Sequence, residues 1–97
     1  MKYIVEYDDE ANNDLINYVD YIERKTFSKE IAEKEWAMIF VETMKLSIMP
    51  YMYPVIYNDF LSFNIKNRRF FYKIYKEKRK VIIYRILSMT QNYENYL

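Results

Sequence analysis

The chain has 97 residues, 15 of them Lys or Arg and 14 Asp or Glu, which gives a formal net charge of +1. This length allows one domain with a modest core and excludes a separate cofactor-binding domain. The 52% hydrophobic and 20% aromatic content excludes a disordered tail. We therefore expect a single folded domain over residues 1–97.

Three residue types are missing from the chain, namely Cys, His and Gly. Without Cys and His, the chain has no thiol nucleophile, disulfide, Cys/His zinc site or imidazole base. Without Gly, phosphate-binding loops of the Walker or dinucleotide type are excluded. We expect no metal and no cofactor, so any chemistry depends on Arg, Lys, Tyr, Ser, Thr, Asp or Glu side chains.

The sequence predicts no targeting or membrane segment. Acidic residues follow the N-terminus at once, beginning with Glu6, and the longest uncharged run, residues 46–58, is interrupted by Pro50 and Pro54. These features argue against a signal peptide and a membrane span. We expect a cytoplasmic protein with no membrane partner.

The first half of the chain predicts a short strand and two helices. Residues 2–7 are β-prone and end at the acidic cluster Asp8–Glu10, which favours a helix start. Apolar residues then recur every three to four positions, which predicts an amphipathic helix over residues 9–25. Ser28 is a typical N-cap for a second helix over residues 28–48. Its expected buried stripe consists of Ala32, Trp36, Ile39, Phe40, Thr43 and Leu46.

The second half of the chain predicts three strands. Runs of β-branched and aromatic residues cover positions 60–66, 69–76 and 81–88, and the charged turn Glu77–Lys80 joins the last two as a hairpin. Residues 91–97 are long enough to dock as one helical turn. The predicted order is β-α-α-β-β-β, an α+β fold with a largely antiparallel sheet and two antiparallel helices packed on one face.

Charge is distributed unevenly along the chain. Residues 1–42 contain 5 basic and 11 acidic residues, whereas residues 66–85 contain 9 basic residues and one acidic residue, Glu77. The sheet side is therefore expected to be cationic and to offer a site for a polyanion or an acidic peptide. Alternatively, the basic residues of the hairpin only form a solvated tip that discourages edge aggregation; these are Lys76, Lys78, Arg79 and Lys80.

Two arginines, Arg69 and Arg85, lie within predicted strands. Strict alternation places Arg69 with Phe71 and Lys73 on a face that we expect to be open. Arg85 lies in a strand that is apolar on both faces, so it requires an anion or several carbonyl groups, supplied either by its own chain or by a ligand. The overall expectation is a cationic sheet that presents both guanidinium groups outward to a macromolecule.

Residues 51–63 are rich in aromatic side chains, namely Tyr51, Tyr53, Tyr57, Phe60 and Phe63. This supply exceeds what a core of this size requires, and Tyr is favoured at interfaces. The segment is expected either to pack on its own domain or to contribute to an interface, with a partner protein or in a homodimer.

The order of elements and several short motifs resemble a known family. Over essentially its whole length the chain is similar to the RelE/ParE superfamily of toxins from type II toxin-antitoxin systems. The resemblance rests on Met49-Pro50 after the second helix, on residues 67–74, and on the aliphatic run 81–87 that contains Arg85. The family's Asn-Tyr-Arg-x-x-Tyr pattern is matched at Asn67, Arg69 and Tyr72, with Arg68 in place of the usual Tyr.

The resemblance implies a small toxin that a cognate antitoxin holds inactive. It also implies one of two targets: RelE-like members cleave mRNA in the ribosomal decoding site, whereas ParE-like members inhibit DNA gyrase and lack that catalytic set. Arg69 matches the arginine that binds phosphate in the ribonucleases, but Ser88–Asn92 stands where those enzymes carry basic residues. This departure favours a ParE-like toxin acting on gyrase, with the ribosome-dependent endoribonuclease as the alternative.

The resemblance also implies the candidate site residues. In an endoribonuclease, Arg69, helped by Arg85, Lys66 or Lys73, would stabilise the phosphate, and Tyr93 or Tyr96 would transfer a proton. The expected binding residues are Lys66, Arg68, Lys73, Gln91 and Tyr96. A third alternative is a non-toxic protein-binding module whose apolar surface pairs with a partner helix or strand.

Overall fold

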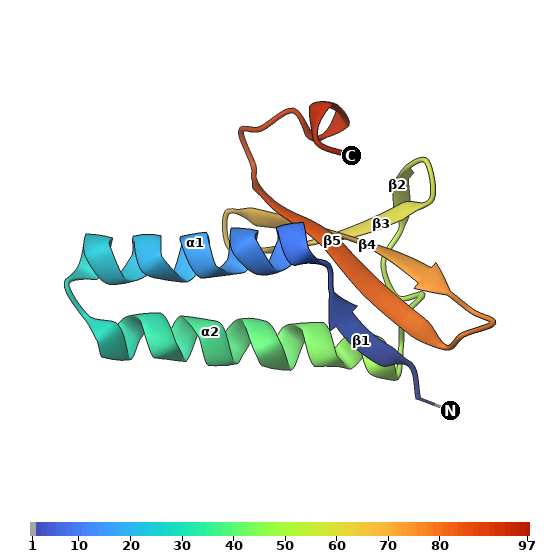
Figure 1. Ribbon diagram of the computed structural model, residues 1–97, viewed down its shortest axis with the longest axis horizontal. Helices are drawn as coiled ribbons and strands as arrows, with labels where there is room; N and C mark the ends of the chain where they lie inside the picture. Colours follow the sequence, from blue (N-terminus) through green and yellow to red (C-terminus); the bar gives the residue numbers. More distant parts are fainter. Residues whose placement is uncertain (1) are drawn as a thin grey trace.

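The computed structural model, which describes residues 2–97, places two helices beside a five-stranded sheet (Figure 1). The helices are α1 (Asp9–Thr26) and α2 (Lys29–Met44), and two 3₁₀ turns are η1 (Lys45–Ser47) and η2 (Tyr93–Asn95). The strands are β1 (Ile4–Tyr7), β2 (Val55–Tyr57), β3 (Phe60–Ile65), β4 (Arg68–Tyr75) and β5 (Lys80–Ser88). Neither helix within residues 2–97 has the length and apolar character that a membrane crossing requires.

Side-chain caps define where the two helices begin. The Asp8 carboxylate accepts a hydrogen bond from the Glu10 backbone N–H at 3.4 Å, and the Ser28 hydroxyl accepts one from the Ile31 N–H at 3.1 Å. Both caps satisfy backbone donors that the first turn of a helix leaves free. The two predicted helix starts are confirmed. The second helix ends at Met44, earlier than predicted, and η1 continues it for one turn.

The sheet has the order β1-β5-β4-β3-β2, with β1 parallel to β5 and the other neighbours antiparallel. A parallel pair needs a long crossover, which the antiparallel helices α1 and α2 supply (Figure 1). The predicted α+β fold is confirmed. The short edge strand β2 was not predicted, because it has only three residues and directly follows Pro54.

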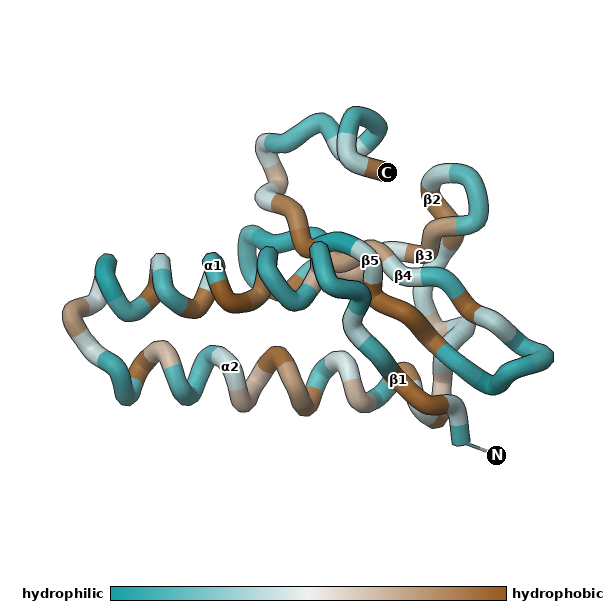
Figure 2. The backbone as a smooth tube through the Cα atoms, viewed as in Figure 1, coloured by the Kyte–Doolittle hydropathy of each residue, from teal (hydrophilic) through white to brown (hydrophobic). Residues whose placement is uncertain are grey.

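The main hydrophobic core lies between the helices and one face of the sheet. Leu15 and Ile39 from the helices pack with Phe70, Tyr72 and other residues of β3, β4 and β5, and each of these four is at most 5% exposed. Hydrophobic stretches run through β5 and β1 in Figure 2, whereas the β4–β5 turn is hydrophilic. Burying a side chain of this size stabilises the fold by about 1.5–3 kcal/mol.

The buried face of α2 differs from the predicted stripe. Trp36 and Phe40 were expected in the core, but they are 43% and 55% exposed. Glu35 is buried instead, in line with Ala32 and Ile39. The reason is that Glu35 has internal polar partners, described below, which hydropathy alone does not reveal.

A β-bulge in β5 changes which residues face the helices. Tyr72 of β4 pairs with Ile83, but its neighbour Phe71 pairs with Arg85, so β5 contains one extra residue, Tyr84. Ile83 therefore joins the main core together with Ile86, whereas regular alternation along β5 would place Ile83 on the same face as Leu87.

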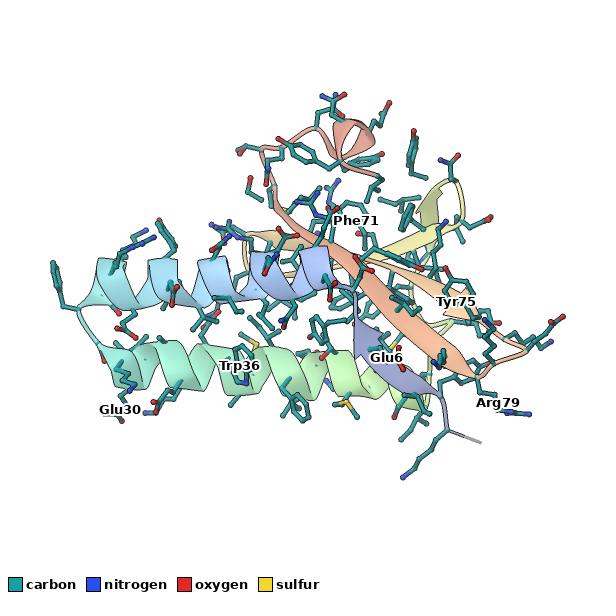
Figure 3. All side chains as sticks on the ribbon, viewed as in Figure 1. Glu6, Glu30, Trp36, Phe71, Tyr75 and Arg79 are labelled. Carbon is teal, nitrogen blue, oxygen red and sulfur yellow. The ribbon has the colours of Figure 1, made fainter. Side chains whose placement is uncertain are left out.

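The opposite face of the sheet has its own small core. Phe60, Phe71 and Leu87 are buried there, and the partly buried side chains that cover them are Tyr57, Tyr84, Tyr93 and Leu97. Figure 3 shows Phe71 between the sheet and the C-terminal segment. The expectation that this face is open is wrong, because Tyr93 packs against Phe71 with ring centroids 5.4 Å apart. The C-terminal residues do form one turn, η2, as predicted.

The chain adopts left-handed backbone conformations without glycine. Phe27, Asn58, Lys66 and Arg79 have φ angles between 49° and 54°. A side chain with a Cβ atom costs about 1–2 kcal/mol in this region, and glycine avoids that cost. Phe27 is the C-cap of α1 and is 95% exposed, so its aromatic ring offsets little of the cost.

Replacing Phe27 by Gly is expected to stabilise the protein. Gly is the preferred residue at this left-handed helix end, and the change should raise the free energy of unfolding by about 0.5–1 kcal/mol, or the melting temperature by roughly 3–6 °C. The measurement is thermal unfolding followed by circular dichroism. Phe27→Ala keeps the Cβ atom and should remain within about 0.3 kcal/mol of the parent protein; equal stabilisation by both variants would contradict the argument.

Candidate functional site

Arg69 lies on the sheet face opposite the helices, in a pocket of about 260 Å³. It pairs with Asn64 of β3, and its guanidinium carbon lies 5.5 Å from the centre of the Tyr93 ring. We call this the Arg69 pocket; its lining residues are Ile56, Ser62, Phe63, Asn64, Arg69 and Tyr93. The strand pairing positions Arg69, and η2 positions Tyr93 beside it, so two of the residues predicted for catalysis lie together.

The Arg69 pocket has the chemistry of an anion-binding site. No carboxylate within residues 2–97 forms an ion pair with Arg69, although a guanidinium group has five N–H donors. Ser62, Asn64 and Tyr93 are further residues with polar side chains among those that line the pocket. No carboxylate lines the pocket. If a reaction in this pocket required a general base, Tyr93 would be the residue to supply it.

Arg85 does not face outward. Its Nε and one terminal nitrogen donate to the two carboxylate oxygens of Asp14 at 2.8 and 3.1 Å, and the other terminal nitrogen lies 3.1 Å from Glu10. The two side chains of the central pair are only 18% and 16% exposed. Hydrogen bonding to Asp14 raises the pKa of Arg85, so the guanidinium stays charged. The expectation of an outward guanidinium is wrong here, because two carboxylates of its own chain, Asp14 and Glu10, engage Arg85.

Lys66 and Arg68 lie beside the helices and not in the Arg69 pocket. Lys66 pairs with Glu35 at 2.7 Å, and the Tyr18 hydroxyl donates to the other oxygen of that carboxylate at 3.1 Å. Burial, and then the neighbouring charge of Glu35, raises the pKa of Tyr18 to about 12. The Arg68 guanidinium carbon lies 4.6 Å from the centre of the Tyr18 ring.

The remaining predicted binding residues are spread over different surfaces. The Lys73 ammonium lies 4.5 Å above the Phe60 ring, and the Tyr96 ring lies 5.3 Å from the Arg85 guanidinium carbon. Gln91 accepts a hydrogen bond from the Ser88 backbone N–H at 2.8 Å, within a pocket that Arg68 also lines. The predicted residues therefore do not form one site. Within residues 2–97 no group of three or more carboxylates is arranged to hold a metal ion.

Ser62 and Asn64 line the Arg69 pocket but were not among the predicted site residues. Their positions in the sequence indicate the face on which they lie, since they alternate along β3 with the buried residues Leu61, Phe63 and Ile65. Asp14 and Glu35 were also missed, and their partners lie 71 and 31 residues away in the chain. No local pattern predicts such pairs.

An exposed apolar surface lies on α2. Trp36, Phe40 and Met44 recur every four residues and are between 39% and 55% exposed. Trp36 and Phe40 also line a groove of about 180 Å³ with Tyr7, Asn12 and Leu15. Trp36 lies near the middle of the helix (Figure 3). Apolar surfaces of this kind commonly mark interaction sites.

The chain was compared with protein families and with solved structures. Residues 5–93 match the model of the ParE toxin of type II toxin-antitoxin systems, parDE. A chain of the chromosomal ParDE toxin-antitoxin system from P. aeruginosa has the same fold, with a TM-score of 0.75 and 14% identity over 90% of this chain and 96% of that chain. A chain of the RelBE2 toxin-antitoxin complex from Mycobacterium tuberculosis gives a TM-score of 0.59 and 21% identity over 91% and 99%. Curated protein sequences gave no significant match.

The fold and these matches define the chain as a toxin of the RelE/ParE superfamily. The family model matches nearly the whole chain, residues 5–93, and it describes one family within this superfamily. The protein belongs to the ParE toxin family of type II toxin-antitoxin systems.

Replacing Asp14 by Asn is expected to destabilise the protein by about 2 kcal/mol. The change keeps the side-chain volume but leaves the half-enclosed Arg85 without its main counter-charge. Urea unfolding gives the free energy, with Asp20→Asn, an exposed carboxylate on the same helix, as the matched control. Equal losses of unfolding free energy in the two variants would show that the Asp14–Arg85 ion pair does not stabilise the protein.

Proposed function

We propose that this protein is a cytoplasmic ParE-like growth inhibitor that acts on DNA gyrase and is neutralised by a cognate antitoxin. The observation that carries the proposal is the isolation of Arg69: its pocket contains one cation, and no carboxylate within residues 2–97 compensates it. Such a pocket suits the capture of an anionic group of a partner better than phosphoryl chemistry. The family membership supports a toxin, and the pocket supports binding as its mode of action.

An endoribonuclease is the second candidate, because Arg69 and Tyr93 lie together as that chemistry requires. Cleavage of a phosphodiester develops negative charge that several cations normally stabilise. Two of the expected cations are engaged elsewhere, Arg85 by Asp14 and Lys66 by Glu35. One arginine and one tyrosine therefore remain in the Arg69 pocket, and Lys73 lies over the Phe60 ring outside it, which favours the gyrase proposal.

Purified toxin, released from its antitoxin and refolded, is expected to inhibit DNA supercoiling by gyrase at micromolar concentration. Arg69→Ala should raise the half-inhibitory concentration about tenfold or more, because it removes a charged donor from the contact. The control is Arg79→Ala, an arginine at the tip of the β4–β5 hairpin (Figure 3), which should change inhibition by less than about twofold.

Two results would contradict the gyrase proposal. Unchanged supercoiling together with new mRNA ends at the ribosomal A site would establish the endoribonuclease instead. Normal growth of an antitoxin-free host that contains verified soluble protein would favour the non-toxic binding module.

We also propose that the antitoxin covers the apolar surface of α2. Trp36, Phe40 and Met44 lie on one side of the helix at a spacing that an amphipathic helix can match. The groove beside them is lined mainly by apolar and aromatic side chains, which anchor partners in protein interfaces.

Trp36 is the only tryptophan of the chain, so its fluorescence reports directly on this surface. Binding of the cognate antitoxin should shift its emission to shorter wavelength as the indole leaves water. Phe40→Ala should weaken binding about tenfold or more, as expected for an aromatic anchor. The matched control is Phe27→Ala, an exposed phenylalanine at the α1–α2 connection; equal weakening by both would exclude this surface.

A further inference from the structure

A second arginine pocket, of about 230 Å³, lies between α1 and the ends of β4 and β5. We call it the Arg68 pocket; its lining residues are Asp14, Asn17, Tyr18, Tyr21, Arg68, Ile86, Ser88 and Gln91. It shares no residue with the Arg69 pocket, because Arg68 and Arg69 are neighbours in a strand and face opposite sides of the sheet. Its ligand is therefore a question separate from the gyrase proposal.

Arg68 is held in place by a chain of internal contacts. Its guanidinium stacks on the Tyr18 ring, the Tyr18 hydroxyl donates to Glu35, and Lys66 fixes that carboxylate from the other side. The Tyr18 ring is 5% exposed and cannot turn away without breaking its hydrogen bond. Because the Tyr18 ring supports the guanidinium from one side, less conformational entropy is lost when Arg68 binds a ligand.

The donors of the Arg68 pocket are largely unused. Within residues 2–97, Arg68 forms no ion pair, and its hydrogen bond to the Asn67 carbonyl oxygen is long, at 3.5 Å. The Gln91 carbonyl oxygen is occupied by the Ser88 N–H, which leaves the amide N–H groups of Gln91 available. A guanidinium and a carboxamide N–H₂ that line the same pocket are together complementary to a carboxylate.

The charged residues around the Arg68 pocket determine which kind of anion it can bind. Asp14 lines the pocket, but its oxygens already accept from Arg85 and from the Ile86 N–H, so its charge is compensated. The rest of α1 is also acidic, with four further acidic residues against two basic residues. This helix repels a chain of phosphates more strongly than one carboxylate, because each added phosphate carries a further negative charge that Arg68 does not compensate.

We propose that the Arg68 pocket binds a single Asp or Glu side chain of a protein partner, between the Arg68 guanidinium and the Gln91 amide. This surface is distinct from the apolar surface of α2 and from the Arg69 pocket. It gives the toxin a polar anchor point whose specificity comes from the rigid placement of Arg68.

The test is a titration of the full ¹⁵N-labelled chain, at pH 6, with N-acetyl-glutamate N′-methylamide. We expect saturable shifts of the Arg68 Nε–H and Gln91 side-chain amide signals, with a dissociation constant on the order of 10 mM, as one charge-assisted contact allows. The neutral glutamine analogue of the probe should produce no saturable shift at these signals.

Variants locate the binding. Arg68→Gln should weaken it about tenfold or more, and Gln91→Ala, which changes an exposed loop residue, should weaken it roughly threefold. The matched control Arg79→Gln removes a charge at the hairpin tip and should leave the dissociation constant within twofold. If Arg68→Gln does not fold, the dissociation constant of Gln91→Ala alone tests the proposal.

Three outcomes would overturn the proposal. Equal shifts at Arg68 and Arg79 would mean unspecific attraction of an anion. Tighter binding of inorganic phosphate than of the carboxylate probe at the same signals would mean a phosphate site. An unchanged dissociation constant in Gln91→Ala would mean that the carboxylate does not lie where the geometry places it.

Discussion

The contact between Asp14 and the bulge of β5 is the interaction on which the arrangement of this protein depends. One carboxylate accepts from the Arg85 guanidinium and from the Ile86 backbone N–H, at 2.8 to 3.1 Å, and so joins α1 to the irregular part of the strand. The bulge directs Ile86 into the main core and Leu87 into the second core. The same contact neutralises Arg85, which leaves Arg69 as the uncompensated arginine on the far face.

Most of the fold was predictable from local patterns. The caps at Asp8 and Ser28, the helical periodicity and the charged hairpin turn each act over a few residues, and the structure confirms them. The bulge was not predictable from local pattern, and the residue that contacts it, Asp14, is 71 residues distant from Arg85. The wrong assignment of Trp36 and Phe40 has the same kind of cause, since the burial of Glu35 depends on partners in other elements.

The candidate site was predictable only in part. The resemblance to the toxin family selected both Arg69 and Tyr93, and in the structure the Arg69 guanidinium carbon lies 5.5 Å from the centre of the Tyr93 ring, while their catalytic role stays a prediction. The resemblance did not predict that Lys66 pairs with Glu35. Lys66 has a left-handed backbone at the β3–β4 turn, and its side chain reaches Glu35 beside the helices. Turn geometry and long-range charge pairing thus decide which basic residues are available to a partner, and composition alone does not.

The uneven charge distribution gives the molecule an electrical polarity along its length. Acidic residues dominate the helices and basic residues the β4–β5 hairpin, and Glu30 and Arg79 lie at opposite ends of an elongated body, 43 Å in its longest extent (Figure 3). Such a molecule is a dipole that rotates in the field of a charged assembly before contact. Encounters would be orientated at low ionic strength and would slow as salt screens the field, while the lifetime of a formed complex would depend on short-range packing.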